Sequence, residues 1–305
     1  MAVTEPEPGK YNQERLGDID KMVEFATGNN IKVYFHQLFG GAVYSPDWID
    51  KGTFTADELG KIMNDRITTL LNRYKNRFQY IDVVNEGLSS GKMTPGGEFD
   101  WRKADHVWMR DMGMYQGKKC QFPKYLTEAF RISREVGGKD LKLVLNEYGN
   151  ATTKSPMGTT FLALIKAMKE EGIPVDDAGI QLHCTLKDGV LFESGKEPFD
   201  FDSFDELLKQ YEEAGIDVHI TEFDIYMSEN PTEADFELQG KYYAEVLRHA
   251  IMSPAVKSFK TWGFTDRHSW ERGSHNGHPL LLDEDFQPKP AYLRQVEMLK
   301  SLSEK

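Results

Sequence analysis

Short apolar runs recur along the chain, and longer stretches with apolar residues three or four positions apart lie between them. The short runs are rich in Val, Ile, Leu, Tyr and Phe. Several of them lack strict alternation of apolar and polar positions, which is typical of strands buried on both faces of a sheet. The pattern predicts six strands, at Ile31–Gln37, Phe78–Asn85, Leu141–Tyr148, Ala178–Cys184, Val218–Asp224 and Ser258–Thr265.

Amphipathic helices are predicted between these strands, and two of them have clear start signals. Thr55 stands three residues before Glu58, which is the pattern of a capping box. Ser155 is followed by Pro156, an N-cap residue before a proline at the first helical position. The predicted helices are Ala56–Tyr74, Pro156–Lys169, Ser203–Tyr211, Glu233–His249 and Pro290–Leu302.

The alternation of strands and helices predicts an α/β fold with parallel strands and crossover helices. A doubly wound sheet and a (β/α) barrel both fit this order. No Gly-x-Gly-x-x-Gly follows the first strand, which disfavours a dinucleotide-binding fold. We see no linker and expect one domain over residues 1–305. The long excursion at Gly87–Gln121 between a strand and the next helix is expected to lie over a functional mouth.

Composition and charge narrow the possible functions. The net charge is −12 and 39% of the residues are hydrophobic. The acidic balance argues against a nucleic-acid-binding surface, and no apolar run is long enough to span a membrane. Cys120 and Cys184 are too few for a disulfide framework or a thiolate metal site. No secretory signal is visible at the N-terminus. A secreted chain with its signal removed, which we favour, and a cytoplasmic chain both remain open.

Polar side chains stand at the carboxyl end of every predicted strand. In a parallel barrel these ends meet around one active site. Glu86 and Glu222 each follow a β-branched apolar run and are expected to face one another. Such a pair of carboxylates is what glycosidic cleavage requires, although two structural, ion-paired residues would produce the same pattern. The polar strand ends are His36 with Gln37, Asn85 with Glu86, Asn146 with Glu147, Gln181 with His183, Glu222 with Asp224, and Trp262 with Asp266.

The motifs around these two residues resemble the signatures of glycoside hydrolase family 10, the retaining endo-β-1,4-xylanases, which have a (β/α)8 TIM-barrel fold. The two catalytic signatures are the segments Asp82–Glu86, read DVVNE, and Ile220–Asp224, read ITEFD. Further similar motifs occur in the family's order over nearly the whole chain. They are the segments at Lys32–His36, Gln181–His183, Thr261–Trp270 and Pro279–Tyr292.

The resemblance implies a role for each matching residue. Glu86 would be the acid/base and Glu222 the nucleophile, with Asp224 supporting. His183 would orient Glu222, and Asn85 would hydrogen-bond the sugar 2-OH. The remaining residues would contact substrate: His36 and Gln181 near the −1 sugar, Trp262 and Trp270 as an aromatic wall and cover, and Tyr148 on the aglycone side.

The reaction that the resemblance implies is hydrolysis of β-1,4-xylosidic bonds in xylan or xylo-oligosaccharides by double displacement. It needs carboxyl groups about 5–5.5 Å apart and no metal or organic cofactor. One rival is a carbohydrate-binding relative with weak or no turnover, and another is activity on a different β-glycan. A third, an aldolase or metal-dependent hydrolase, would need a Schiff-base lysine or clustered metal ligands, which we do not find.

The sequence also departs from the family pattern. Its first residues resemble the segment after the second barrel strand, so we expect a barrel that lacks the first two strands, with about six β/α units. Open edges of this kind are costly. Either the sheet closes differently, or the excursion at Gly87–Gln121 folds over the gap, or a homo-oligomer covers it, which we favour. A truncated chain is a further alternative. The stretch Gln37–Ala42 has glycines where the family has an aromatic residue and an imidazole. The segment Asn146–Gly149 departs from the family's Asn-Asp-Tyr-Asn. Both changes predict weaker glycone contacts.

Overall fold

All six predicted strands are present in the computed structural model, which describes residues 4–40, 44–94, 96–102, 105–194, 197–228, 230–270 and 277–304. Their bounds differ by a few residues from the prediction. They are β1 (Tyr34–Phe35), β2 (Tyr80–Asn85), β7 (Lys142–Glu147), β8 (Asp177–Ile180), β12 (Val218–Tyr226) and β13 (Val256–Thr261). The interior of β2 and of β12 is buried on both faces, as the apolar runs predict.

The predicted strand Ala178–Cys184 is corrected by the structure. It ends at Ile180, and Cys184 belongs to a separate strand, β9 (His183–Lys187). Leu182 lies between the two with a φ of 64°, a left-handed conformation that a strand cannot contain. The break turns the chain, and β9 continues into an antiparallel extension with β10 (Val190–Glu193) and β11 (Glu197–Pro198).

The described residues form two compact units. The first comprises the chain up to Glu147 together with Thr160–Ala178, and the second comprises Tyr148–Thr159 and the chain from Gly179 onward. In the first unit the strand order is β1-β2-β7-β8. The pairs β1–β2 and β2–β7 are parallel. The division between the units falls within β8, and in the second unit β12 pairs with β9 and β13.

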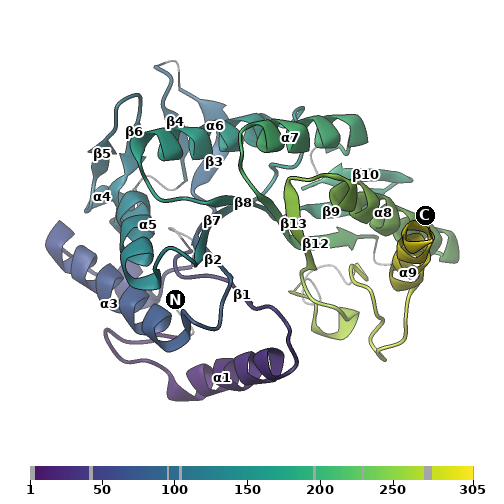
Figure 1. The fold of residues 1–305 in the computed structure, drawn as a ribbon, viewed down its shortest axis with the longest axis horizontal. Helices are drawn as coiled ribbons and strands as arrows, with labels where there is room; N and C mark the ends of the chain where they lie inside the picture. The colour runs from purple at the N-terminus through teal and green to yellow at the C-terminus, as the bar shows by residue number, and fades with distance from the viewer. Residues whose placement is uncertain are drawn as a thin grey trace. The chain divides into compact units, whose positions relative to one another are not determined.

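Helices cover the sheet of the first unit (Figure 1), where α3 and α5 pack against each other. The helix α3 begins and ends where the sequence predicts, and its capping box at Thr55 and Glu58 is formed. The sequence prediction missed α1, which buries only Leu16 and Val23. It gave no bounds for α5, the helix expected after the excursion. The helices of this unit are α1 (Gln13–Gly28), α2 (Asp47–Asp50), α3 (Ala56–Tyr74), α4 (Val107–Arg110) and α5 (Lys124–Gly137); α6 (Pro156–Glu171) begins in the second unit and ends in the first.

The excursion after β2 is built largely from two small hairpins. The first pairs β3 (Leu88–Met93) with β4 (Phe99–Trp101), and the second pairs β5 (Met114–Gln116) with β6 (Gln121–Pro123). The Thr160 hydroxyl on α6 donates to the carbonyl of Gly91 at 2.6 Å. The first hairpin is therefore tied to the part of α6 that belongs to the same unit.

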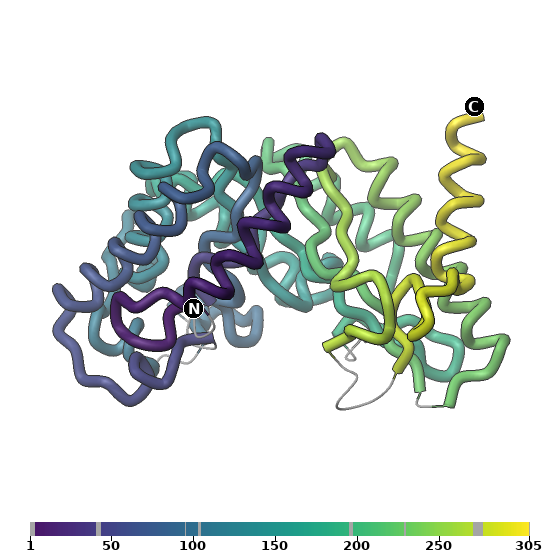
Figure 2. Tube along the Cα trace, turned by 90° about the horizontal axis from the view of Figure 1, so that it is seen from below, coloured from purple at the N-terminus to yellow at the C-terminus, as the bar shows by residue number. Residues whose placement is uncertain are grey.

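In the second unit the helices are α7 (Phe201–Glu213), α8 (Glu233–Met252) and α9 (Pro290–Ser303), all close to their predicted bounds. The helix α9 runs beside α8 at the end of the chain (Figure 2). A capping box at Thr232 and Asp235 begins α8. Among the described residues no helix is both long and apolar enough to cross a membrane.

A buried ion pair ties the start of α9 to the segment after β13. Lys289 precedes α9, and its ammonium donates to Asp266 at 2.9 Å and to the carbonyls of His278 and Leu280. Burial lowers the pKa of Lys289, and Asp266 opposes this effect. Both side chains are at most 6% exposed, so breaking the pair leaves a buried charge without its ion-pair partner.

We expect Lys289→Met to lower the free energy of unfolding by about 3–5 kcal/mol, because Asp266 would remain buried without its cation. Urea unfolding measures this loss. The control is Lys300→Met at an exposed position of α9, which should change stability by less than about 0.5 kcal/mol. Equal effects of the two substitutions would contradict a structural role for the pair.

Candidate active site

Glu86 lies directly after β2, where the chain leaves the sheet. Its backbone N–H donates to the carbonyl of Asn146 at 2.9 Å and so continues the pairing of β2 with β7. The φ of Glu86 is 59°, a left-handed conformation that turns the following residues away from the strand. Two residues later, the N–H of Leu88 donates to the buried carboxylate of Glu147 at 2.9 Å. The turn that carries Glu86 is thus held at both ends.

The Glu86 carboxylate is ion-paired with the guanidinium of Arg102. Arg102 follows β4 directly, and its backbone N–H donates to the carbonyl of Gly87 at 2.9 Å. The Glu86 side chain is 11% exposed and that of Arg102 is 28% exposed. This ion pair therefore borders solvent rather than lying in the core.

Two further predicted residues lie near the ends of neighbouring strands in the same unit. Asn85 is buried, and its side-chain oxygen accepts a hydrogen bond from Asn146 at 2.9 Å. The imidazole of His36 lies 2.8 Å from the buried carboxylate of Asp82, which also accepts from the hydroxyl of Tyr34 at 2.6 Å. Hydrogen bonds thus hold both side chains at the positions where β1 and β2 place them.

Glu222 lies within β12 in the second unit and is 4% exposed. Its backbone N–H donates to the carbonyl of Gln181 at 3.0 Å, which brings the segment after β8 beside β12. The imidazole of His183 lies 3.3 Å from the Glu222 carboxylate and 2.8 Å from Asp224. The expected contact between His183 and Glu222 is therefore present, and Asp224 completes a row of three charged groups.

His183 is held in its charged form by its two neighbours. Burial alone would lower the pKa of His183, but Asp224 and Glu222 outweigh it and raise the pKa to about 10. At neutral pH the ring is then an imidazolium, with Nδ1 donating to Asp224 and Nε2 donating to Glu222. Burial raises the pKa of Asp224, while His183 opposes that shift.

Two tryptophans flank this row. Trp270 donates its indole N–H to Asp224 at 3.3 Å and is 58% exposed. The ring centroids of His183 and Trp270 are 5.6 Å apart, and those of His183 and Trp262 are 6.3 Å apart. A charged network with an exposed aromatic face beside it can bind a sugar, whose C–H faces pack on aromatic rings and whose hydroxyls hydrogen-bond to charged groups.

Two predicted substrate residues remain, and one tryptophan of the excursion lies in the core. Gln181 is buried, and Tyr148 is half-buried directly after β7. Trp108 in the excursion is fully buried and donates to Ser45 at 3.0 Å, so it packs in the core. Gly41 and Ala42, which belong to the stretch that departs from the family pattern, lie outside the described residues. Among the residues that the structure describes, no cluster of His, Cys, Asp and Glu could hold a metal ion.

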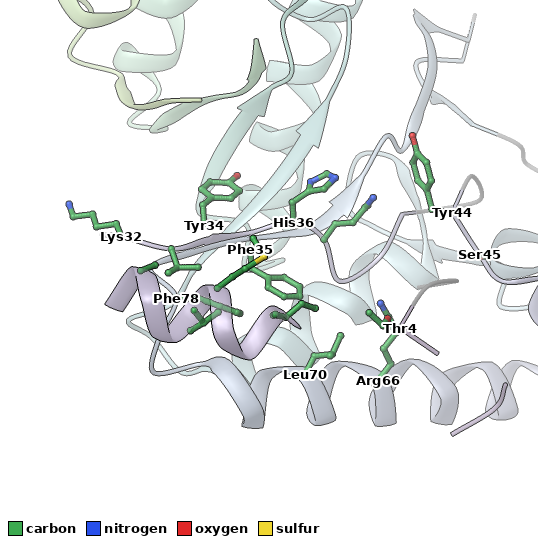
Figure 3. A pocket seen from close by; sticks show the side chains of 16 residues that line it. Thr4, Lys32, Tyr34, Phe35, His36, Tyr44, Ser45, Arg66, Leu70 and Phe78 are labelled. Carbon is green, nitrogen blue, oxygen red and sulfur yellow. The ribbon is translucent and has the colours of Figure 1, made fainter. Parts of the chain in front are cut away.

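A cavity of about 730 Å³ lies in the first unit beside β1. Tyr34 and His36 project on one side of β1, and Phe35 projects on the other side toward Leu70 and Phe78 (Figure 3). The lining is mainly apolar and includes residues of α1 and α3. Because β1 is the last strand in the order of its sheet, the cavity borders an edge of the sheet.

Comparison with known proteins decides the family. The model of glycosyl hydrolase family 10 matches residues 1–298. The chain belongs to this family. Its α/β fold is the TIM-barrel-like fold of solved family 10 structures: it superposes on xylanase 10B from Thermotoga maritima with a TM-score of 0.82 and 31% identity, covering 100% of this chain and 85% of that one.

Other relatives of the chain are xylanases as well. Endo-1,4-beta-xylanase B of Thermotoga neapolitana is 28% identical over 97% of this chain and 76% of that protein. Xylanase 10B from Thermotoga petrophila RKU-1, solved in complex with xylobiose, has a TM-score of 0.82 at 30% identity and covers 98% of this chain and 82% of that one. Membership in the family places the chain among glycosidases of xylan degradation.

Sequence reasoning did not predict the contacts that three residues make in the structure. Arg102 pairs with Glu86 from sixteen positions away, and no local pattern links the two. Glu147 was noted as a strand-end carboxylate, and its contact with Leu88 depends on how the excursion begins. Lys289 is part of a family motif, but its burial against Asp266 is visible only in the structure.

We expect the stabilising effect of His183 to depend on pH. Its pKa in the folded protein, about 10, lies above the ordinary value of 6.5. The contribution of the charged ring is therefore complete below pH 6.5 and is lost as the pH rises toward 10. Urea unfolding of wild type and His183→Asn should show a stability difference that is largest near pH 6.5 and shrinks by pH 9.5. A difference that is constant over this window would contradict the charged state of His183.

Proposed function

We propose that the chain is a retaining endo-β-1,4-xylanase that hydrolyses xylan and xylo-oligosaccharides by double displacement. The observation that carries the proposal is the buried Glu222 beside the His183 imidazolium, on a chain whose family and relatives are xylanases. The xylobiose complex of the Thermotoga petrophila relative supports xylo-oligosaccharides as ligands here.

In the first step, Glu222 attacks the anomeric carbon of the sugar and forms a covalent ester with it. The bond from this carbon to the glycosidic oxygen breaks, and Glu86 transfers its proton to that oxygen. In the second step, Glu86 removes a proton from water, and the water oxygen replaces Glu222 at the anomeric carbon. Two inversions give net retention of configuration.

The surroundings of the two glutamates suit these different tasks. The imidazolium of His183 donates to Glu222 and supports the ionised form that a nucleophile needs. Glu86 instead lies in a turn at the rim of its own unit, partly exposed, where a proton can be exchanged with a leaving group or with water. Asp224 acts through His183, whose orientation it fixes by the 2.8 Å contact.

We assign the other predicted residues to substrate contacts. Asn85 would hydrogen-bond the sugar 2-OH, and His36 and Gln181 would contact the −1 sugar. Tyr148 would lie on the aglycone side. Trp262 and Trp270 would supply aromatic faces, which fits the exposure of Trp270. We also propose that the two units together act as one catalytic domain, since a single family model covers residues 1–298.

One further expectation from the sequence stays a prediction. It is that a homo-oligomer covers an open edge of the sheet, which the apolar cavity beside β1 favours. Two exposed apolar side chains on α1, Met22 and Phe25, also favour it.

We expect Glu86→Gln and Glu222→Gln each to reduce xylan hydrolysis by at least ~10²-fold, because each removes a group that transfers a proton or forms the covalent bond. Release of reducing sugar measures the loss, and NMR of the first product should show the β-anomer. The control is Glu135→Gln on the exposed face of α5, which should leave the rate unchanged.

Unchanged hydrolysis in both active-site variants would refute the assignment. Calorimetric binding of xylotriose by a wild-type protein that releases no reducing sugar would instead favour a carbohydrate-binding relative without turnover. Hydrolysis of another β-glycan but not of xylan would keep the mechanism and change the substrate.

A further inference from the structure

The ion pair of Arg102 with Glu86 carries a further inference, which deepens the proposed function and rests on it. We propose that Arg102 is a positioning residue that holds the acid/base Glu86 in the orientation for proton transfer. Arg102 comes from the first hairpin of the excursion rather than from a strand of the sheet. The excursion would then be part of the catalytic apparatus.

Glu86 needs support from outside its own strand. Its left-handed backbone conformation is unfavourable for a residue with a β-carbon, so neighbouring contacts must hold it. The N–H of Glu86 is bonded to Asn146, and the turn that follows is bonded through Leu88 to Glu147. These bonds fix the backbone, and the ion pair with Arg102 fixes the side chain.

Arg102 is itself well anchored, as a positioning residue must be. Its N–H donates to the carbonyl of Gly87, the residue after Glu86. The preceding residue, Trp101, is 7% exposed and pairs with Leu88 across the hairpin. The same hairpin is tied to α6 by the hydrogen bond from Thr160 to Gly91. The guanidinium of Arg102 therefore extends toward the Glu86 carboxylate from a hairpin that is held by hydrogen bonds and packing.

The guanidinium suits this task because it is planar and always charged, and its N–H groups match the two oxygens of a carboxylate. When Glu86 gives its proton to the glycosidic oxygen, the resulting carboxylate already faces a cation. A misplaced carboxyl group would slow that transfer strongly even with substrate bound normally. The effect should depend on how much the leaving group needs a proton.

The experiment compares Arg102→Met with wild type on two aryl β-xylobiosides. With a phenyl leaving group, which must be protonated, we expect kcat/KM to fall by roughly 10–100-fold. With a dinitrophenyl leaving group, which departs as a stable anion, we expect a fall of less than about twofold, because the first step needs little acid catalysis. Arg102→Lys, which keeps the charge, should recover part of the loss.

The matched control is Lys92→Met, which removes an exposed cation from the same hairpin. It should leave both substrates unaffected. A second readout does not depend on turnover: in protein labelled with ¹³C at the glutamate carboxyls, the resonance lost in Glu86→Gln belongs to Glu86. That resonance should shift in Arg102→Met and stay in place in Lys92→Met.

The outcomes separate the inference from the function on which it rests. Equal slowing on both leaving groups, or an unmoved Glu86 resonance in Arg102→Met, would overturn the positioning role while the xylanase assignment stands. A wild-type protein that hydrolyses neither glycoside would refute the proposed function, and with it the positioning role of Arg102.

Discussion

A protonated histidine between two carboxylates is the interaction on which the candidate site of the second unit depends. Glu222 and Asp224 come from one face of β12, and two anions so close together in a buried place would repel each other. The His183 imidazolium gives each of them a partner, and its pKa of about 10 keeps it charged over the whole neutral range. The break at Leu182 between β8 and β9 sets where His183 lies along β12.

Glu86 receives its cation in a different way. Its partner, Arg102, is delivered by a hairpin inserted after β2 rather than by the next strand. The Arg102 guanidinium lies at a partly exposed site, where Glu86 can lose and gain a proton while the cation stays beside it. The buried His183 imidazolium instead stabilises the ionised form of Glu222 until Glu222 forms a covalent bond. The two glutamates differ because a hairpin supplies the cation of Glu86 and β9 supplies that of Glu222. This difference agrees with the proposed roles of Glu86 as acid/base and Glu222 as nucleophile.

Much of this fold could be predicted from the sequence, because the helix caps and apolar patterns match the residues that the structure buries. The capping box at Thr55 and the apolar period of α3 specify that helix completely. The runs that become β2 and β12 are buried on both faces, so their apolar character is unbroken. The weakly amphipathic α1 offers no such signal, since only Leu16 and Val23 are buried on it.

The candidate site was predictable only in part, for a physical reason. Residues at strand ends are placed by the sheet, so Glu86, His183 and Glu222 could be named from their positions in the pattern. Their partners are placed by tertiary contacts. Nothing near Arg102 in the sequence indicates its pairing with Glu86, and nothing near Leu182 indicates the left-handed turn that separates β8 from β9. The pairing of Arg102 and the turn at Leu182 both depend on a left-handed backbone conformation, at Glu86 and at Leu182. This conformation is unfavourable for residues other than glycine, and no sequence pattern here indicates it.

The most direct test of the central claim is to trap the covalent intermediate on the nucleophile. A xylobioside with fluorine at C2 and a dinitrophenyl leaving group should inactivate the enzyme, because fluorine slows the second step more than the first. Mass spectrometry of the peptic digest should then show one added fluoroxylobiosyl group, on the peptide that contains Glu222. A label on any other residue, or release of the phenol without any label on the protein, would contradict the account.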